Sequence, residues 1–512
     1  MPHKNILLII ADDLGKYVGC YGCPSVTTPN LDKLAGEGSR FDVAFASTAS
    51  CSGSRSTIYT GLHTHENGQY GLNIYRTHFQ TFPHVDSAPK LFNEAGYLTG
   101  ILGKIHVGPD EVYPWQWRLE SESRDVAWVA DKSGDFFEKA KDEDKPFFLT
   151  VGFVDPHRDI TTRGGFGNDT EYDSRVKKLE ISETDVLVPE WLPDLPETRR
   201  ELVEYYKAIY RTDQGVGMIL ENLERLGLKD DTLVVFTSDN GPPFINAKTT
   251  LYDAGTCLPL LVRQPGSPAG VINPNMVSYI DFLPTFLDWA GISSNQGVEG
   301  AKYAAPGSGH GHEVVPSPPR RGRSFLSIID ESTLLPESKW QHHVFGSHTF
   351  HELHNYWPTR VLRTRRYKYH RNIAWRLDFP FAADLYASYT WEGIRKSTDK
   401  PYMIGSRSLD NYLFRPNEEL FDIEKDPLEL TNLADDPEHA DLLKKMRSQL
   451  ETWQHDTHDL WLYRDGQSLE MLDRYGKDGL RVPNRFDMDN KTPFDESRGT
   501  TGTLRSAIAE SL

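Results

Sequence analysis

Two short apolar runs, far apart in the chain, each end directly in acidic or amide residues. Runs of this length are typical of strands buried inside a parallel sheet. Ligand sites in open α/β sheets lie outside the carboxyl ends of such strands, so we expect these polar side chains to share one edge of a sheet. The runs and the residues that follow them are Asn5–Ala11 before Asp12 and Asp13, and Thr232–Ser238 before Asp239 and Asn240.

The rest of the first 340 residues alternates between predicted strands and predicted helices. Such alternation predicts an α/β fold with a large, mixed but mostly parallel sheet between helices. Further strands are expected at 98–103, 146–153 and 258–262, and helices at 29–35, 54–62, 197–227 and 279–289.

The pattern changes near residue 340, and we expect two domains, a catalytic one at 1–340 and a smaller α+β domain at 341–512. Aromatic-rich alternating segments such as 361–369 predict an antiparallel sheet with one face in solvent. A helix is expected at about 438–455. Residues 296–323 are rich in Gly, Pro, Ser and Arg and predict a long surface loop.

Charge and composition exclude several classes of protein. The 512 residues carry 56 Lys and Arg against 74 Asp and Glu, a net charge of −18. Such a surface repels phosphate backbones, so we expect no nucleic-acid partner. No apolar run approaches the ~18 residues of a membrane span, so we expect no membrane partner, and the first run is too short for the core of a signal peptide. With only four cysteines, we expect a cytoplasmic protein of a reducing compartment, which could form a homodimer.

Asp12, Asp13, Asp239 and Asn240 offer only oxygen ligands. A site of that kind suits a hard cation, Ca²⁺ or Mg²⁺, better than zinc. Either pair alone is more simply explained as a helix cap or a tight turn. Two pairs at the ends of two buried strands favour a metal site.

Cys51 precedes a predicted helix, with Arg55 one helical turn further on. A helix N-terminus and a guanidinium would both stabilise an anion beside the cysteine. A buried structural cysteine next to a serine-rich helix start explains the segment equally well.

Two lysines and two histidines also follow predicted strands: Lys104, His106, His157 and Lys248. Lys104 and His106 lie two residues apart, so in an extended segment they would face the same side. Such a group can bind a tetrahedral oxyanion and protonate a leaving group. Singly, each is more simply an ordinary surface residue.

Together these segments resemble the type I sulfatases, and within them the heparan N-sulfatase (sulfamidase) group. The similarity extends from about residue 5 to 461, and the combined set of motifs is far more specific than any one of them. The general sulfatase motifs are Asp12–Gly15, Cys51–Arg55 with Tyr59–Leu62, Gly103–His106, Asp155–His157, Ser238–Gly241 and Leu251–Gly255. The motifs closer to sulfamidase are His65–Leu72, His106–Pro109, Asp213–Gly217, Phe345–Ser347 with His351 and Glu352, Pro358–Arg360, and Thr457–Asp459.

The resemblance implies a mechanism built on a modified Cys51. A formylglycine-generating enzyme would oxidise the thiol to an aldehyde, which hydrates to a geminal diol. One hydroxyl would attack sulfur, and the other would later release sulfate. The small sulfated substrate, a sugar or an aryl or alkyl sulfate, would carry either an O-sulfate or an N-sulfate.

The resemblance also implies a role for each site residue. Ca²⁺, or Mg²⁺, would be held by Asp12, Asp13, Asp239, Asn240 and residue 51. Arg55 would hold the hydrate, Lys104 and Lys248 the sulfate oxygens, His106 would assist the hydrate and His157 would protonate the leaving group. Expected substrate contacts are Asp155, His351, Glu352 and Arg360, the last being either a pocket cation or a structural ion-pair partner.

One departure from the family motif keeps alternatives open. Gly53 stands where the motif has proline, and glycine leaves the unfolded segment less ordered for the converting enzyme. An unconverted Cys51 would leave a non-catalytic protein that binds sulfated ligands. A phosphonate or phosphodiester hydrolase on the same scaffold is the other alternative.

Overall fold

A computed structural model describes residues 4–293, 317–462 and 474–479. Its larger sheet has nine strands in the order β4-β3-β5-β1-β6-β7-β2-β8, with β9 paired to β2. Among the described strands of this sheet, only β7 runs against the others. The strands are β1 (Asn5–Ala11), β2 (Ser39–Phe45), β3 (Leu98–Gly103), β4 (Trp117–Glu120), β5 (Phe147–Gly152), β6 (Thr232–Ser238), β7 (Cys257–Arg263), β8 (Val271–Asn273) and β9 (Val277–Ser278).

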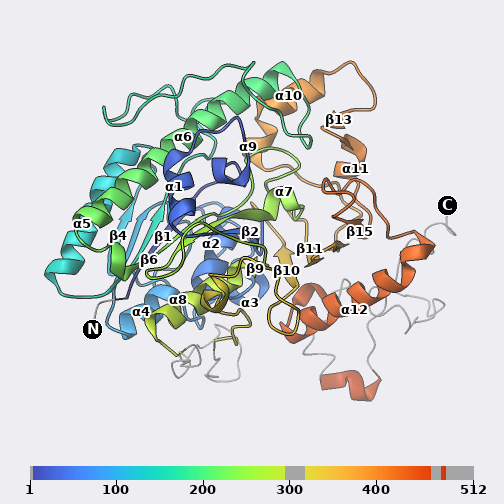
Figure 1. The fold of residues 1–512 in the computed structure, drawn as a ribbon. Helices are drawn as coiled ribbons and strands as arrows, with labels where there is room; N and C mark the ends of the chain where they lie inside the picture. Colours follow the sequence, from blue (N-terminus) through green and yellow to red (C-terminus); the bar gives the residue numbers. More distant parts are fainter. Residues whose placement is uncertain (1–3, 294–316, 463–473, 480–512) are drawn as a thin grey trace.

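Helices cover both faces of this sheet, as the alternation predicted. In β1, Leu7 and Ile9 join one apolar core, and Ile6, Leu8 and Ile10 join the other. The first core contains side chains of α1, α5 and α6, and the second those of α2, α4 and α8 (Figure 1). Burial on both faces explains why the strand is continuously apolar. The helices of this half are α1 (Pro29–Glu37), α2 (Cys51–Thr60), α3 (Thr64–Asn67), α4 (Ala88–Glu94), α5 (Val126–Asp142), α6 (Pro196–Arg225), α7 (Asp253–Thr256) and α8 (Phe282–Ala290).

Most predicted elements are confirmed within a few residues, with two informative shifts. α2 begins at Cys51 rather than Ser54, so the cysteine is the first residue of the helix. The helix predicted at 279–289 is a 3₁₀ turn at Tyr279–Asp281 followed by α8, which ends at Gly291 with a positive φ of 71°.

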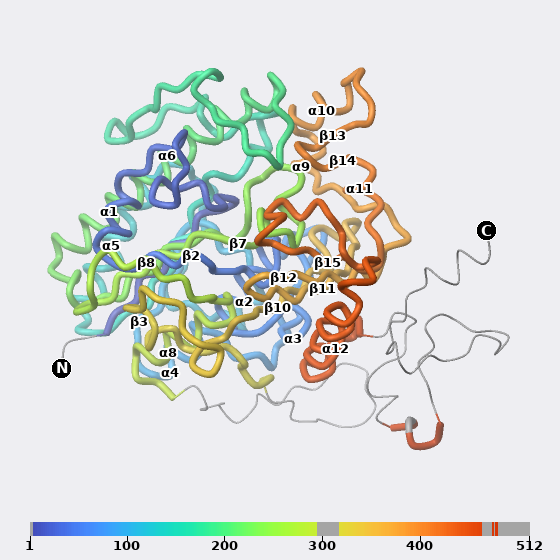
Figure 2. Tube along the Cα trace, turned by 45° about the vertical axis from the view of Figure 1, so that its right-hand side comes forward, coloured from blue at the N-terminus to red at the C-terminus, as the bar shows by residue number. Residues whose placement is uncertain are grey.

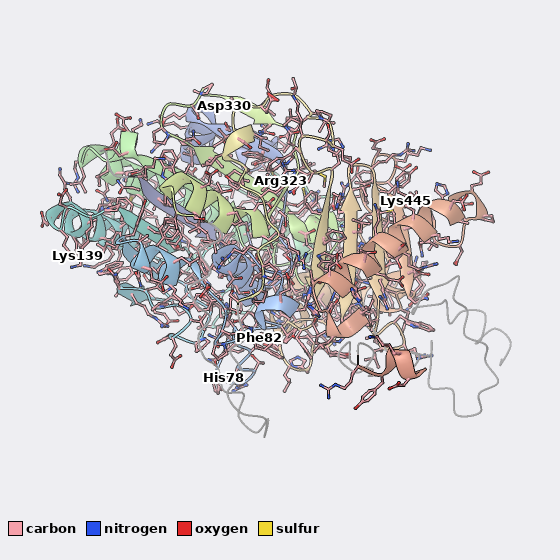
Figure 3. All side chains as sticks on the ribbon, turned by 90° about the horizontal axis from the view of Figure 1, so that it is seen from below. His78, Phe82, Lys139, Arg323, Asp330 and Lys445 are labelled. Carbon is pink, nitrogen blue, oxygen red and sulfur yellow. The ribbon has the colours of Figure 1, made fainter. Side chains whose placement is uncertain are left out.

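The C-terminal region carries a separate antiparallel sheet in the order β10-β11-β12-β15. α12 packs on it through Leu443, Met446, Leu450 and Trp453, and the two lie together on one side of the molecule (Figure 2). Seen from below, α12 with Lys445 and α5 with Lys139 occupy opposite ends (Figure 3). The elements are β10 (His343–His348), β11 (Thr359–Thr364), β12 (Tyr367–Asn372), β13 (Met403–Ile404), β14 (Arg407–Ser408), β15 (Glu418–Asp422), α9 (Ala383–Tyr386), α10 (Tyr389–Lys396), α11 (Leu409–Leu413) and α12 (Ala440–Asp456).

The expectation that one face of this sheet is in solvent is wrong. All of β15 and most of β11 and β12 are buried. The second face packs on α7, where Asp253 accepts hydrogen bonds from Arg363 and Lys368. The polar alternation in these strands reflects buried ion pairs rather than a face in solvent. The predicted loop at 296–323 lies largely outside the described residues. The division at residue 340 stays a prediction, and the two sheets fall on either side of it.

Among the described residues, the structure contains no helix long and apolar enough to cross a membrane.

Candidate active site

The two acidic strand ends meet at one edge of the large sheet. β1 and β6 pair in parallel with Ala11 opposite Ser238, which brings the residues that follow into contact. The Asp13 amide donates to Asp239 Oδ1 at 3.0 Å, and Asn240 Nδ2 donates to Asp13 Oδ1 at 2.6 Å. All four side chains are fully buried. The predicted convergence is therefore confirmed.

Cys51 lies over these carboxylates at the start of α2. Its Sγ is 3.4 Å from Asp12 Oδ1 and 3.9 Å from Asp13 Oδ1. Burial and the negative charge of Asp12 raise the pKa of the thiol well above its usual range. An unmodified Cys51 therefore stays a neutral thiol at neutral pH, and a thiol is a poor nucleophile.

Arg55 extends one helical turn from Cys51 into the same cluster. Its Nε donates to Asp239 Oδ2 at 2.9 Å, and its Nη1 donates to the Lys104 carbonyl at 3.0 Å. The whole side chain is buried. Because α2 is buried along its full length, the guanidinium has little freedom to leave this position.

Two ammonium groups complete the charged cluster. Lys104 Nζ donates to Asp12 Oδ2. Lys248 Nζ donates to Asp13 Oδ2 at 2.9 Å and to Asp384 Oδ2 at 2.8 Å, and lies 3.3 Å from His157 Nε2. Burial alone would raise the pKa of Asp12, but the positive charge of Lys104 lowers it well below its usual range. Burial and the charge of Asp12 raise the pKa of Asp239 to about 7.

Both predicted catalytic histidines reach the cluster and are neutral at pH 7. Burial and then the charge of Lys248 lower the pKa of His157. Its Nδ1 donates to the Arg158 carbonyl at 2.7 Å, so the neutral ring presents an unprotonated Nε2 to Lys248. Burial and then Lys104 lower the pKa of His106.

The expectation that Lys104 and His106 share an extended segment is wrong. β3 ends at Gly103, whose φ is 85°, and His106 has a left-handed φ of 59°. A Cβ at position 103 would lie 2.2 Å from the Gly152 carbonyl oxygen, so the chain turns there on a glycine. The turn, rather than strand alternation, carries both side chains to the site.

The residues expected to contact substrate divide into two groups. His351 belongs to the cluster: it is buried, and its Nδ1 lies 2.9 Å from Ser50 Oγ. Burial and then the charge of Lys248 lower the pKa of its ring, against the charge of Asp384. Glu352 faces the exposed His354 at 3.3 Å and stays a prediction.

Asp155 and Arg360 are engaged in structural ion pairs. Asp155 binds Arg124 through one oxygen and Arg211 through the other, at 2.5 Å for the second. Arg360 donates to both oxygens of Asp459 at 2.6 and 2.8 Å and is fully buried. The geometry thus supports the structural alternative for Arg360. Asp155 has a structural role in its two ion pairs, and its contact with substrate stays a prediction.

Sequence reasoning missed Asp384, which comes from the short helix α9 in the C-terminal region. Despite burial, Lys248 and His157 lower the pKa of this carboxylate far below its usual range. Asp384 follows no predicted strand and belongs to no quoted motif, so its sequence position gave no signal. Only the tertiary contact with Lys248 reveals it.

The cluster suits a divalent cation. Asp12, Asp13, Cys51 and Asp239 can offer ligand atoms that lie within 4.8 Å of one another. Asn240 Oδ1 is buried, and no hydrogen-bond donor reaches it from any described residue. An orphaned amide oxygen beside three buried carboxylates is the donor set expected for a hard cation.

Comparison with known proteins agrees with this geometry. A family model described as Sulfatase matches residues 4–292. The chain belongs to the sulfatase family. This sulfatase is 38% identical over 486 residues to the N-sulphoglucosamine sulphohydrolase of Homo sapiens, covering 91% of this chain and 93% of that protein. It is 26% identical to an ulvan-active sulfatase of Formosa agariphila, covering 88% and 75%.

Solved structures share the fold of this sulfatase. The structure of BT4656 with its substrate D-glucosamine-2-N,6-O-disulfate has a TM-score of 0.60 at 20% identity, covering 89% of this chain and 98% of that one. The phosphonate monoester hydrolase of Agrobacterium radiobacter also has a TM-score of 0.60 at 20% identity, covering 89% and 96%. At this identity the likeness concerns the fold alone. The family generally uses formylglycine and a divalent metal.

Proposed function

We propose that this sulfatase hydrolyses the N-sulfate group of an amino sugar and that Cys51 is its formylglycine precursor. The observation that carries the proposal is the convergence of Arg55, Lys104 and Lys248 on the carboxylates beside Cys51. Three buried cations can bind a sulfate group in a protein whose net charge is −18. The choice of N-sulfate is supported by the 38% identity to N-sulphoglucosamine sulphohydrolase.

We also propose Ca²⁺ as the bound cation, with Mg²⁺ as the alternative. Asp12, Asp13, Asp239, Asn240 and residue 51 would hold it. Formylglycine and the cation together supply an activated oxygen nucleophile at neutral pH. Every remaining part of the chemistry falls to side chains of this chain.

Those side chains bind and orient the sulfate. Lys104 lies on Asp12, next to Cys51, and its remaining N–H groups can point to sulfate oxygens placed over residue 51. Lys248 already reaches Asp13, Asp384 and His157 with its three N–H groups, so it would turn one of them to the sulfate when the substrate binds. Arg55 stays paired with Asp239, and its positive charge would stabilise the group at residue 51. We propose that His106, whose buried Nδ1 has no hydrogen-bond partner among the described residues, accepts a proton from that group.

His157 is the proposed acid for the leaving nitrogen. Its Nδ1 is fixed by a backbone carbonyl, so the transferable proton must sit on Nε2, which faces the cluster. Lys248 lowers the pKa of the ring in the free protein. A bound sulfate carries the opposite charge and therefore favours the protonated ring when it is needed.

We propose further that a formylglycine-generating enzyme matures Cys51 and that the C-terminal region lines the pocket. Asp384 and His351 come from that region and lie beside Lys248. We expect them to contact the sugar rather than the sulfate.

The test compares substrates on one preparation of protein with converted residue 51. We expect sulfate release from glucosamine 2-N-sulfate, and faster turnover of an aryl sulfate than of the matched aryl phosphonate monoester. Cys51→Ala should lower turnover by about 10⁴-fold or more, as for removal of other catalytic nucleophiles. Faster cleavage of the phosphonate would overturn the assignment.

A further inference from the structure

A second cavity, distinct from the cluster around Cys51, lies in the C-terminal region, where α11, β15 and the turn that follows β12 contribute to its lining. Its volume is about 500 Å³. It is lined by Trp375, Arg407, Asn411, Phe414, Arg415 and Glu419, among others. None of these residues was singled out by the sequence or used in the proposed reaction.

The cavity contains two buried arginines that lack an ion-pair partner. Arg407 is 4% exposed and Arg415 is 2% exposed. Among the described residues, no carboxylate oxygen lies within 4 Å of either guanidinium. Buried charges are normally paired, because leaving them unpaired is costly.

Arg415 also has unused hydrogen-bonding capacity. Its Nε donates to the Tyr412 carbonyl at 3.1 Å, but Nη2 is buried and finds no acceptor in the described part of the chain. The guanidinium stacks 3.8 Å from the centre of the Phe379 ring. The aromatic contacts hold its plane in place and leave its N–H edge without a partner.

Both guanidiniums contact one aromatic ring. Arg407 lies 4.1 Å and Arg415 4.7 Å from the centre of the Tyr252 ring. Two carboxylates, Glu419 and Asp435, also line the cavity, and the oxygens of Glu419 already accept from Tyr252 Oη at 3.2 Å and from Asn372 Nδ2 at 2.8 Å. Arg407 donates from Nη2 to the Leu428 and Glu429 carbonyls at 3.0 and 2.8 Å, so Nη1 is the donor that it retains for a ligand. Two guanidinium charges without an ion-pair partner in the described part of the chain, each with N–H groups left over, suit an oxyanion.

The cavity wall also offers an aromatic surface for a ring. Trp375 and Phe414 line it, and Phe414 is 58% exposed. Large exposed aromatic side chains beside a few fixed polar groups are typical of pockets for small organic molecules. A bare ion would need no such surface.

We propose that this cavity is a second oxyanion-binding site, which takes the sulfate or carboxylate group of an acidic sugar unit. The existence of the site does not depend on the reaction at Cys51, and only the choice of a sugar rests on the proposed function. The cavity touches the segment that carries Lys248, because Arg407 Nε donates to Asn246 Oδ1 at 3.0 Å. The protein therefore has one binding position for an acidic saccharide on each side of that segment.

The number of binding sites can be measured by calorimetric titration of full-length Cys51→Ala protein, which binds substrate without turnover. The probes are inorganic sulfate and a sulfated glucosamine disaccharide. We expect two sites for the disaccharide. Arg415→Met should weaken one of them about tenfold or more, because a charge-assisted hydrogen bond to a buried group is lost. Arg376→Met, which changes the exposed arginine next to Trp375, is the matched control and should retain both sites.

Asn411→Trp provides a second variant that does not disturb the buried arginines. Asn411 is exposed and its side chain makes no hydrogen bond with any described residue, so the larger ring fills the cavity from its rim. It should remove the same site as Arg415→Met. In protein with converted residue 51, both variants should turn over an aryl sulfate at the parent rate.

Three results would overturn the proposal. One is a titration that shows a single site in the parent protein. Another is a titration that shows two sites of unchanged affinity in both variants. If inorganic sulfate fills the second site as tightly as the disaccharide does, the ligand is a free oxyanion and the sugar part is wrong. Failure of the proposed function would appear instead as absent turnover by the converted protein, with the number of sites unchanged.

Discussion

The two sheets contribute to the site in different ways. The large parallel sheet supplies its residues directly after strand ends, as with Asp12 after β1 and Asp239 after β6. The smaller region supplies Asp384 and His351 from a short helix and a loop, through tertiary contacts alone. The residues proposed for sulfate chemistry therefore follow a local sequence pattern, whereas those proposed to contact the rest of the substrate do not.

The largest effect should come from the strand-end group. Lys248→Ala removes an ammonium that is placed to stabilise charge developing on sulfate, and we expect turnover of an aryl sulfate to fall about 10²- to 10³-fold. Lys248→Arg retains the charge, so its turnover should fall less. Steady-state kinetics with both variants gives the measurement, and an unchanged kcat in Lys248→Ala would remove this residue from the chemistry.

A smaller effect is expected from the dispersed group. Asp384→Asn keeps the shape of the side chain but removes the charge that anchors Lys248 at 2.8 Å. We expect kcat/KM for the amino-sugar substrate to fall about tenfold, with a smaller change for a small aryl sulfate. Equal losses on both substrates would mean that Asp384 belongs with the sulfate-binding group, and the comparison between the regions would fail.

Stability against acid should reveal the contact between the two regions. Burial lowers the pKa of His65 to about 4 and of His348 to about 3. Their unfolded forms titrate near 6.5, so the unfolded chain binds protons first as the pH falls. Each histidine should remove about 1.4 kcal/mol of stability per pH unit between roughly pH 6.5 and its folded pKa.

Urea unfolding at pH 7.5, 6 and 5 would measure this loss. His65→Asn should reduce the slope, because one buried neutral imidazole no longer has to be charged. An unchanged slope in His65→Asn would contradict the burial of a neutral ring at this position. The comparison with the parent is needed because Asp239, whose pKa is raised to about 7, contributes to the slope with the opposite sign in both proteins.

The smallest effect concerns Gly53. A Cβ at this position would lie 2.8 Å from Thr48 Cγ2, so the folded helix has no room for a ring there. Gly53→Pro should raise the converted fraction of Cys51 while lowering the free energy of unfolding by about 1–3 kcal/mol through overpacking. Thr48→Ser removes only the obstructing methyl group, and the double variant should regain the lost stability. If Thr48→Ser gives no gain in stability in the Gly53→Pro background, packing against Thr48 is not the reason for glycine at position 53.

Much of the fold could be predicted because buried parallel strands are continuously apolar and end in polar residues. The same logic placed Asp12, Asp13, Asp239 and Asn240 together. It failed for β11, β12 and β15, because polar alternation looks the same whether it faces water or buried ion pairs such as Lys368 with Asp253. It missed Asp384 because no local pattern marks a residue whose role depends on a partner 136 positions away.

The most direct test of the account is mass spectrometry of the tryptic peptide from Phe41 to Arg55, from protein made in its native cell. Burial keeps an unmodified Cys51 as a thiol, so the proposed reaction requires its conversion. The account predicts the mass of formylglycine at residue 51, in a fraction that matches the active fraction of the protein. An unmodified thiol in protein that still releases sulfate would contradict it.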